Sequence, residues 1–331
     1  MTIAPTRARV RVRRLSACKP TGRLQLGNLF GMILPLVAGQ DDSETVTMLA
    51  DLHSLTVEHD PAAVRGRTLE QAAVLLAAGV DPRRCTLYVQ SHLPEHTQLH
   101  YLLECATGYG EAQRMVAFKE KAGRGEQVRL SLLTYPVLMA ADILLHDTEQ
   151  VPVGDDQLQH VELARAIANR FNGRYGQVFT VPEAVPAPVA ARVMDLADPT
   201  AKMGKTNVVS AGVISILDEP DVVRRKVNRA VTDSESTVRH DRERQPGVTN
   251  LLEIYQACTG STGHFGSYGQ LKRETAEAVV AVLTPIQERY EALRRRPETV
   301  EAALAEGARR ARPRAAATLR RAGEAIGLVS S

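Results

Sequence analysis

The chain has 331 residues, of which 44% are hydrophobic and 24% are charged, and its formal net charge is +3. This length predicts about two domains with a full hydrophobic core, and a charge so close to neutral does not by itself indicate nucleic-acid binding. No apolar run approaches the ~20 residues that span a bilayer, and the basic N-terminus lacks the apolar segment of a secretory signal, so we expect a cytoplasmic protein with no membrane association.

Strand and helix signals alternate through the first half of the chain. Short segments of strand type occur at 9–15, 45–50, 86–90 and 150–153. Helical patterns occur at 27–37, 61–78, 95–105, 111–121, 132–145 and 157–171. Such alternation predicts a parallel sheet covered by helices on both faces. Because ligands of these sheets bind beyond the carboxyl ends of the strands, the turns that follow the strands are the expected walls of a site.

The second half of the chain has a different pattern. Residues 178–200 are rich in proline and alanine, and we expect them to form a connection with little regular structure. Pro313 is expected to kink the last helix. The fold class predicted for the whole chain is α/β with a second, all-helical domain. From residue 219 onward only helical signals appear, at 219–231, 248–258, 272–294 and 298–326.

Two short segments suggest adenylate transfer when they are considered together. The first, Pro20–Asn28, is a glycine-bearing turn that opens a helix, where free N–H groups and the helix dipole favour a phosphate. The second contains Lys202 and Lys205 on one short loop, in a chain with seven lysines among 41 basic residues. Lysine is a compact charge on a flexible stem and can follow a phosphate during a reaction. The alternative is that both are ordinary surface lysines.

One acidic residue lies within a strongly apolar helical segment, 134–145. Tyr135, Met139 and Asp142 are spaced four and then three residues apart, so they share one helical face. A carboxylate on an apolar helix is costly unless a donor meets it. The donor could belong to the protein, with His146 at the i+4 position as the candidate, or it could be an N–H group of a ligand.

Further polar side chains follow predicted strands. The segment 151–157 ends a strand with Asp155, Asp156 and Gln157, and a carboxylate in this place commonly accepts from a ribose hydroxyl. Helix N-capping by either aspartate is the alternative. His53 also follows a strand, where a structural role competes with a catalytic one. Residues 115–125 carry two lysines and two glycines, typical either of a basic tip over an anionic site or of a solvated helix end.

Taken together, these segments show that the sequence resembles the bacterial tryptophanyl-tRNA synthetases of class I. The motifs that carry the resemblance occur in the family's order and cover nearly the whole chain after residue 14. They are PTGRLQLGN, DLHSLT, FKEKAG, LLTYPVLMAADILL, VPVGDDQLQHVELARAIANRFN, DPTAKMGKT, AVTDSES and PGVTNLL. The resemblance implies a Rossmann-like catalytic domain over 1–200, a signature loop and helical anticodon-binding domain over 201–300, and a C-terminal helix over 301–331 that packs back on the catalytic domain.

The resemblance also implies site residues, by position in this sequence. Lys121, Lys202 and Lys205 would act on the phosphates during catalysis. The implied ATP-binding residues are Lys19, Thr21, Gln25, Gly27, Asn28, Gly154, Asp156 and Met203. The implied tryptophan-binding residues are Leu15, Ala17, His53, Tyr135, Met139, Asp142, Ile143, Val151, Val153 and Gln157. Within this set, Asp142 would accept the indole N–H.

The same resemblance implies the substrates and partners. ATP is expected to bind with Mg²⁺, and no metal ligated tightly by the protein is expected, because the four cysteines form no CxxC spacing. The expected partners are L-tryptophan, tRNA(Trp) and a second copy of the chain in a homodimer. An apolar slot with one buried acceptor discriminates against phenylalanine by roughly 10⁴–10⁵ without editing.

The chain departs from the family at several matched positions. Gln25 stands where class I enzymes mostly carry His or Thr, and Leu15 where relatives usually have an aromatic residue. Ala17 replaces a glycine, Lys19 stands where many relatives have Gln, and the loop reads KMGKT instead of KMSKS. These changes raise the hypothesis of an auxiliary, inhibitor-tolerant copy of the enzyme.

Two functions follow from these observations. The first is a working tryptophan–tRNA ligase, which the retained lysines and Asp142 favour. The second is a synthetase paralogue without charging activity that serves as a regulatory or RNA-binding module, which the altered residue at 25 keeps open. The arginines at 309–321 are consistent either with a tRNA contact or with a solvated charged face.

Overall fold

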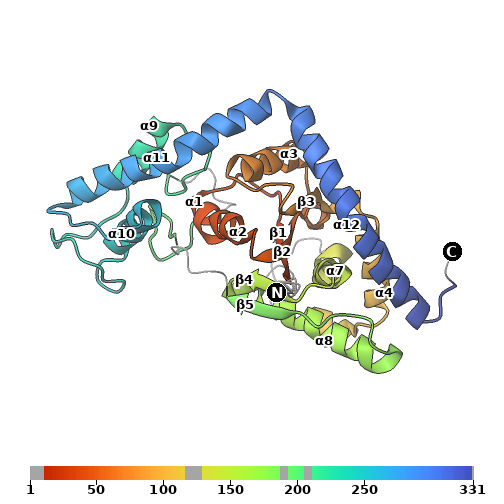
Figure 1. Ribbon diagram of the computed structural model, residues 1–331. Helices are drawn as coiled ribbons and strands as arrows, with labels where there is room; N and C mark the ends of the chain where they lie inside the picture. The colour runs from red at the N-terminus through yellow and green to blue at the C-terminus, as the bar shows by residue number, and fades with distance from the viewer. Residues whose placement is uncertain (1–10, 116–128, 187–192, 205–210, 330–331) are drawn as a thin grey trace, which may run out of the picture.

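The computed structural model describes residues 11–115, 129–186, 193–204 and 211–329, apart from the side chain of Asp155 (Figure 1). Its centre is a five-stranded sheet in the order β3-β2-β1-β4-β5, with every neighbouring pair parallel. The expected parallel sheet is therefore confirmed. The strands are β1 (Val12–Cys18), β2 (Ser43–Leu49), β3 (Thr86–Val89), β4 (Gln150–Val153) and β5 (Glu183–Pro186).

Two of the strands differ from the sequence-based expectation. β1 continues past the expected end at residue 15 to Cys18, because its whole length pairs with β2, from Val12 opposite Ser43 to Cys18 opposite Leu49. The expectation of an irregular connection over 178–200 is wrong at β5. This strand pairs with β4 at the edge of the sheet, where prolines are tolerated because one side of the strand needs no ladder hydrogen bonds.

Helices cover both faces of the sheet, as expected. The first half contains, in chain order, α1 (Leu26–Asn28), a π-helical turn (Leu29–Ile33), α2 (Leu34–Gly39), α3 (Pro61–Ala77), α4 (Glu95–Glu104), α5 (Tyr109–Arg114), α7 (Leu130–Leu145) and α8 (Leu158–Tyr175). Short 3-10 turns follow the strands at Leu52–Thr56, Gln90–His92 and Asp155–Gln157.

The core divides into two clusters because side chains alternate across a strand. Leu49 and Leu87 pack in the cluster that includes residues of α1, α3 and the C-terminal helices. Their neighbours Met48 and Tyr88 pack in the other cluster, with residues of α4, α7 and α8. The sheet is therefore buried on both faces, as parallel sheets require.

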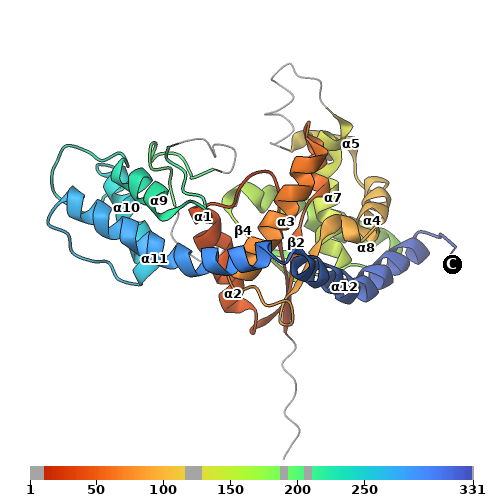
Figure 2. The same ribbon diagram turned by 90° about the horizontal axis from the view of Figure 1, so that it is seen from above.

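The second half is helical, as predicted from residue 219 onward. It contains α9 (Pro220–Asn228), α10 (Pro246–Thr259), α11 (Tyr268–Arg294) and α12 (Pro297–Ala325). α11 packs against α9, α10 and α3, whereas α12 turns away and packs against β3, α4, α3 and α7 (Figure 2). Helical structure in α12 continues through Pro313. None of the described helices is both long enough and apolar enough to cross a membrane.

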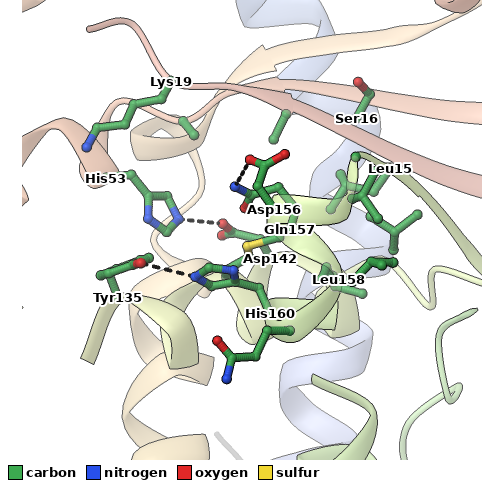
Figure 3. Close-up of a pocket in the computed structure, with 18 of the residues that line it drawn as sticks. Leu15, Ser16, Lys19, His53, Tyr135, Asp142, Asp156, Gln157, Leu158 and His160 are labelled. Atoms are coloured by element: carbon green, nitrogen blue, oxygen red, sulfur yellow. Dashed lines mark hydrogen bonds and ion pairs between the residues drawn. The ribbon is translucent and has the colours of Figure 1, made fainter. Parts of the chain in front are cut away.

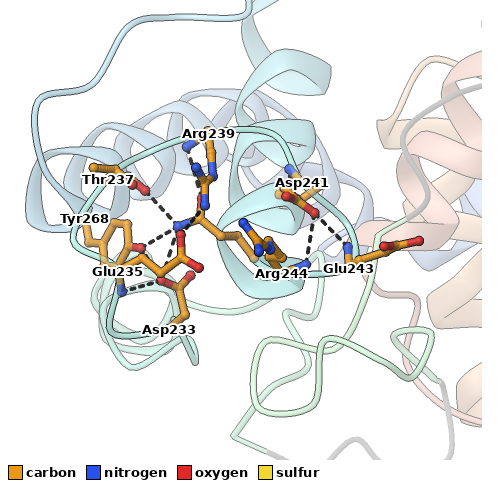
Figure 4. Close-up of polar contacts among 10 residues, drawn as sticks. Asp233, Glu235, Thr237, Arg239, Asp241, Glu243, Arg244 and Tyr268 are labelled. Atoms are coloured by element: carbon orange, nitrogen blue, oxygen red, sulfur yellow. Dashed lines mark hydrogen bonds and ion pairs between the residues drawn. The ribbon is translucent and has the colours of Figure 1, made fainter.

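The segment between α9 and α10 is fixed by side-chain hydrogen bonds (Figure 4). Buried Gln245 is the centre: its two Nε2 hydrogens face three acceptors, namely Asp233, the Thr237 carbonyl and the Tyr268 hydroxyl, and its Oε1 accepts from the Arg239 N–H. Burial and the hydrogen bond to Asp233 raise the pKa of Tyr268 to about 12. This part of the AVTDSES motif is thus held to the helical region by its own polar groups.

Candidate functional site

The principal cavity lies where the strand order reverses. The chain passes from β1 outward to β2 and β3, and then returns to β4 on the other side of β1. Ligands in open parallel sheets bind at such a point, beyond the carboxyl ends of the strands. A cavity of about 1030 Å³ is lined there by residues from β1, β4, α7 and the turns that follow β2 and β4.

The cavity brings together most of the residues predicted from sequence. Those that line it are Leu15, Ala17, Lys19, His53, Tyr135, Met139, Asp142, Ile143, Val151, Val153, Gly154, Asp156 and Gln157. Six predicted residues, Thr21, Gln25, Gly27, Asn28, Lys202 and Met203, are described but lie outside its lining. Lys121 and Lys205 fall outside the described residues.

Asp142 lies at the floor of the cavity and is 2% exposed (Figure 3). Its Oδ2 is 2.9 Å from His53 Nε2, and its Oδ1 accepts from Gln90 Nε2 at 2.7 Å and lies 2.7 Å from His96 Nδ1. Burial alone would raise the pKa of Asp142, but hydrogen bonding from His53 and His96 holds it well below its usual value. The carboxylate is therefore ionised and surrounded by nitrogen donors.

The expectation that His146 is the protein partner of Asp142 is wrong. His146 is the C-cap residue of α7, and its Nε2 lies 2.6 Å from the Tyr88 hydroxyl instead. Burial lowers the pKa of His146 to about 3, so its ring is neutral. The partners of Asp142 come from the segments that follow β2 and β3. Helical spacing could not predict them, because they lie outside α7.

A second ring cluster forms the side of the cavity near α8. The Tyr135 hydroxyl lies 3.1 Å from His160 Nε2, and their rings are 5.6 Å apart. His53 meets Tyr135 edge to face at 6.1 Å. Burial lowers the pKa of His160, which keeps a neutral ring beside the cavity. Sequence reasoning missed His160, although its place one turn into the helix after Gln157 was an available signal.

The polar rim of the cavity carries charges of both signs. Lys202 Nζ lies 3.8 Å from Asp156 Oδ1, and the other oxygen of Asp156 accepts from Gln157 Nε2 at 2.8 Å. Lys19 also lines the cavity and donates to Thr56 Oγ1 at 3.3 Å. Asp156 therefore connects the cavity to the loop of Lys202, even though the loop is not itself a wall.

Gln25 joins the first motif to the lysine loop. Its Oε1 accepts from the Gly27 N–H at the start of α1, and its Nε2 donates to the Met203 carbonyl at 2.6 Å. Asn28 completes a capping box by accepting from the Gln25 N–H at 3.2 Å. Gln25 is 5% exposed, and both polar atoms of its side chain are hydrogen-bonded to the protein. In this structure Gln25 therefore holds the start of α1 and the loop of Lys202 together.

The arginines of α12 have intramolecular partners. Arg314 pairs with Glu44, Arg321 with Asp147, and Arg312 donates to the His92 carbonyl. Arg310 donates to the Pro82 carbonyl, whereas Arg309 and Arg320 pair with glutamates of their own helix. Several of these side chains therefore attach α12 to the sheet region, a role that neither sequence-based alternative included.

The donors around the cavity do not form a metal site. Among the described residues, no group of three or more His, Cys, Asp or Glu side chains is arranged to hold a metal ion. The cavity instead combines an apolar slot, one enclosed carboxylate and a polar rim. This arrangement suits a ligand with an apolar body, one N–H donor and a charged end.

Comparison with known proteins gives consistent results. The family described as "tRNA synthetases class I (W and Y)" matches residues 7–284. "Tryptophan--tRNA ligase 1" of Streptomyces avermitilis is 53% identical over 96% of this chain and 99% of that protein. The tryptophanyl-tRNA synthetase of Mycoplasma pneumoniae is 36% identical, with a TM-score of 0.89 over 96% of this chain and 98% of the other. The Campylobacter jejuni enzyme, solved with ADP and tryptophan, is 32% identical, with a TM-score of 0.83 over 96% and 100% of the two chains.

Proposed function

The chain belongs to the class I tRNA synthetases of the W and Y group, and we infer from this membership and from its site that it is a tryptophan–tRNA ligase. It activates L-tryptophan with ATP to tryptophanyl-adenylate and pyrophosphate, and it then transfers tryptophan to tRNA(Trp). Relatives at 53% identity over nearly the full length support this reading and disfavour a paralogue without charging activity.

The observation that best supports tryptophan as the substrate is the enclosed Asp142 carboxylate in an apolar slot. Its Oδ2 has one hydrogen bond, from His53, and an ionised carboxylate oxygen can accept a second. The indole N–H is such a donor, and Leu15, Ile143 and Val151 supply apolar contacts for the ring. A phenyl side chain would leave the buried acceptor without its partner, which is the basis of strong discrimination without editing.

We assign the remaining predicted residues either to the tryptophan site or to the ATP site. Tyr135, Met139 and Gln157 hold the amino end of tryptophan, and Ala17, Val153 and His53 complete its pocket. Gly154, Asp156 and Lys19 face the nucleotide. Thr21, Gly27 and Asn28 present the start of α1 to ATP, and Gln25 and Met203 hold the signature loop beside it.

The chemistry requires positioning and charge stabilisation, and it needs no protein nucleophile. The carboxylate of tryptophan attacks the α-phosphorus of ATP, the bond from the α-phosphorus to the α,β-bridging oxygen breaks, and pyrophosphate leaves with that oxygen. Lys202, together with Lys121 and Lys205, stabilises the charge that develops on the pyrophosphate. Bound with ATP, Mg²⁺ would supply further charge neutralisation, with phosphate oxygens and water as its main ligands.

The same membership supports a proposal for the larger assembly. Two copies of the chain form a homodimer in the cytoplasm, and one tRNA contacts both subunits. Within a subunit, we propose a catalytic domain over residues 1–200, a region over 201–300 with the signature loop and the anticodon-binding helices, and a C-terminal region over 301–331 that contains most of α12. Light scattering of the purified protein tests the dimer, because a monomer at micromolar concentration would contradict it.

Lys202 tests the proposed chemistry. Lys202→Ala should slow single-turnover formation of tryptophanyl-adenylate by about 10²-fold or more, because one charge-stabilising donor of the transition state is lost. The affinity for tryptophan should change by less than about twofold, because the lysine acts at the phosphates. Weakened tryptophan binding with an unchanged adenylation rate would contradict the assignment.

A further inference from the structure

A buried chain of close polar contacts extends from Asp142 into the core. His96 Nδ1 lies 2.7 Å from Asp142 Oδ1, and His96 Nε2 lies 2.8 Å from the Tyr88 hydroxyl. The same hydroxyl lies 2.6 Å from His146 Nε2. Tyr88 and His96 are 0% exposed, so no water competes for these groups. The three residues come from β3, α4 and the end of α7.

The charge of Asp142 fixes the hydrogen on His96. An ionised carboxylate only accepts, so His96 must present an N–H at Nδ1. A neutral imidazole with its hydrogen at Nδ1 leaves Nε2 as an acceptor, and the imidazolium form leaves Nε2 as a donor. Any other tautomer would place two acceptors 2.7 Å apart in a buried site.

Tyr88 can satisfy His96 in either protonation state. Its hydroxyl donates to Nε2 of the neutral ring while it accepts from neutral His146, or it accepts from the imidazolium while it donates to His146. Burial raises the pKa of Tyr88 well above its usual value, so the hydroxyl keeps its proton. Without this hydroxyl, His96 Nε2 would be buried without a partner, and the hydrogen at Nδ1 would no longer be specified.

We propose that Tyr88 and His96 are positioning residues for tryptophan selection: Tyr88 fixes the tautomer of His96, and His96 in turn orients the ionised Asp142 toward the indole N–H. This inference rests on the proposed function and adds two residues that touch neither substrate. Tyr88 and His96 act through the Asp142 carboxylate alone, so they should affect the binding only of ligands that donate a hydrogen bond to Asp142.

A tryptophan isostere separates this role from ordinary structural damage. In β-(3-benzothienyl)alanine a sulfur atom replaces the indole N–H, so the ring fills the same slot and donates nothing to Asp142. The readout is kcat/KM in ATP–pyrophosphate exchange for tryptophan and for the isostere, measured on the same preparation. The ratio of the two values does not depend on the fraction of the protein that is folded.

Tyr88→Phe should lower kcat/KM for tryptophan by about tenfold, the effect of one weakened hydrogen bond to a charged group, and for the isostere by less than about twofold. Tyr290→Phe is the matched control, because Tyr290 is also buried but lies in α11, and neither value should change. Equal losses for both amino acids, or no loss for either, would overturn the proposal.

His96→Asn provides the second variant. An asparagine amide can present an N–H near the place of Nδ1 and has no tautomer to fix, so Tyr88→Phe should add little loss in this background. A full tenfold loss on adding Tyr88→Phe to His96→Asn would contradict the route through His96. Absence of tryptophan-dependent exchange in the unaltered protein would instead reject the proposed function itself.

Discussion

At the scale of single residues, Asp142 shows what the sequence could and could not predict. A carboxylate in an apolar helix needs a donor, so its importance was predictable from residues 134–145 alone. Two of its partners, His53 and Gln90, lie 89 and 52 residues away in sequence. Such partners depend on how the sheet brings strand ends together, and helical spacing carries no information about that.

Replacing Asp142 by alanine should reduce selectivity for tryptophan. The loss of the acceptor should cost about 1–3 kcal/mol in kcat/KM for tryptophan, and less for phenylalanine, which donates nothing to it. Exchange assays with both amino acids measure the difference. Equal losses for tryptophan and phenylalanine would assign Asp142 to structure alone.

Lys19 is the residue through which inhibitor tolerance can be tested. It lines the cavity and donates to Thr56, and a lysine cannot accept a hydrogen bond as the glutamine of many relatives can. We expect Lys19→Gln to increase sensitivity to tryptophan-mimicking antibiotics by roughly ten- to a hundredfold, with tryptophan and ATP constants nearly unchanged. Inhibition constants that stay the same would remove Lys19 from the explanation.

At the scale of structural elements, a hydrogen bond joins the short helix α1 to the loop that contains Lys202 and Met203. The sequence predicted that both segments act on ATP, but it did not predict that they touch. Gln25 supplies the contact through its hydrogen bond to the Met203 carbonyl. A residue that looked like a departure from the family pattern is thus placed where it can set the position of the loop.

The two ends of the Gln25 amide allow a matched pair of variants. Gln25→Glu keeps an oxygen for the Gly27 N–H but replaces the donor to Met203 with a second acceptor, whereas Gln25→Ala removes both bonds. We expect each variant to slow adenylate formation by about tenfold, the effect of one lost hydrogen bond with an unpaired carbonyl, while tryptophan affinity stays within about twofold. Full activity of Gln25→Glu would show that the bond to the loop is dispensable.

The C-terminal helix is attached to the sheet at a point where only glycine fits. A Cβ atom added at Gly307 of α12 would lie 1.8 Å from the Leu87 carbonyl oxygen of β3. This close approach could not be predicted from the sequence, because glycine in a helix pattern has several explanations. Leu87 directly precedes Tyr88, so the same contact also fixes the strand that reaches the buried histidines.

Gly307→Ala should therefore destabilise the protein by about 1–3 kcal/mol, because the backbones must separate. Gly323→Ala on the same helix is the control: its nearest neighbour would be 3.8 Å away, and alanine favours the helix by up to ~1 kcal/mol. Urea unfolding measures both free energies. Equal stability of the two variants would show that α12 can move off β3 without cost.

At the scale of the whole molecule, the sequence predicted the sheet, its helical cover and the helical second half, because these depend on local patterns of apolar residues. It missed β5, which is short and lies between prolines at the sheet edge. It also missed that arginines of α12 pair with Glu44 and Asp147 across the sheet region. Both features depend on contacts between segments that lie far apart in the sequence.

The central claim is that the whole chain forms one working site for tryptophan activation. Tryptophan-dependent ATP–pyrophosphate exchange by the purified, folded protein tests it most directly, with tyrosine and phenylalanine as competing substrates. We expect exchange that requires Mg²⁺ and that favours tryptophan over phenylalanine by roughly 10⁴-fold or more in kcat/KM. No exchange above background with tryptophan, or exchange of similar efficiency with tyrosine, would contradict it.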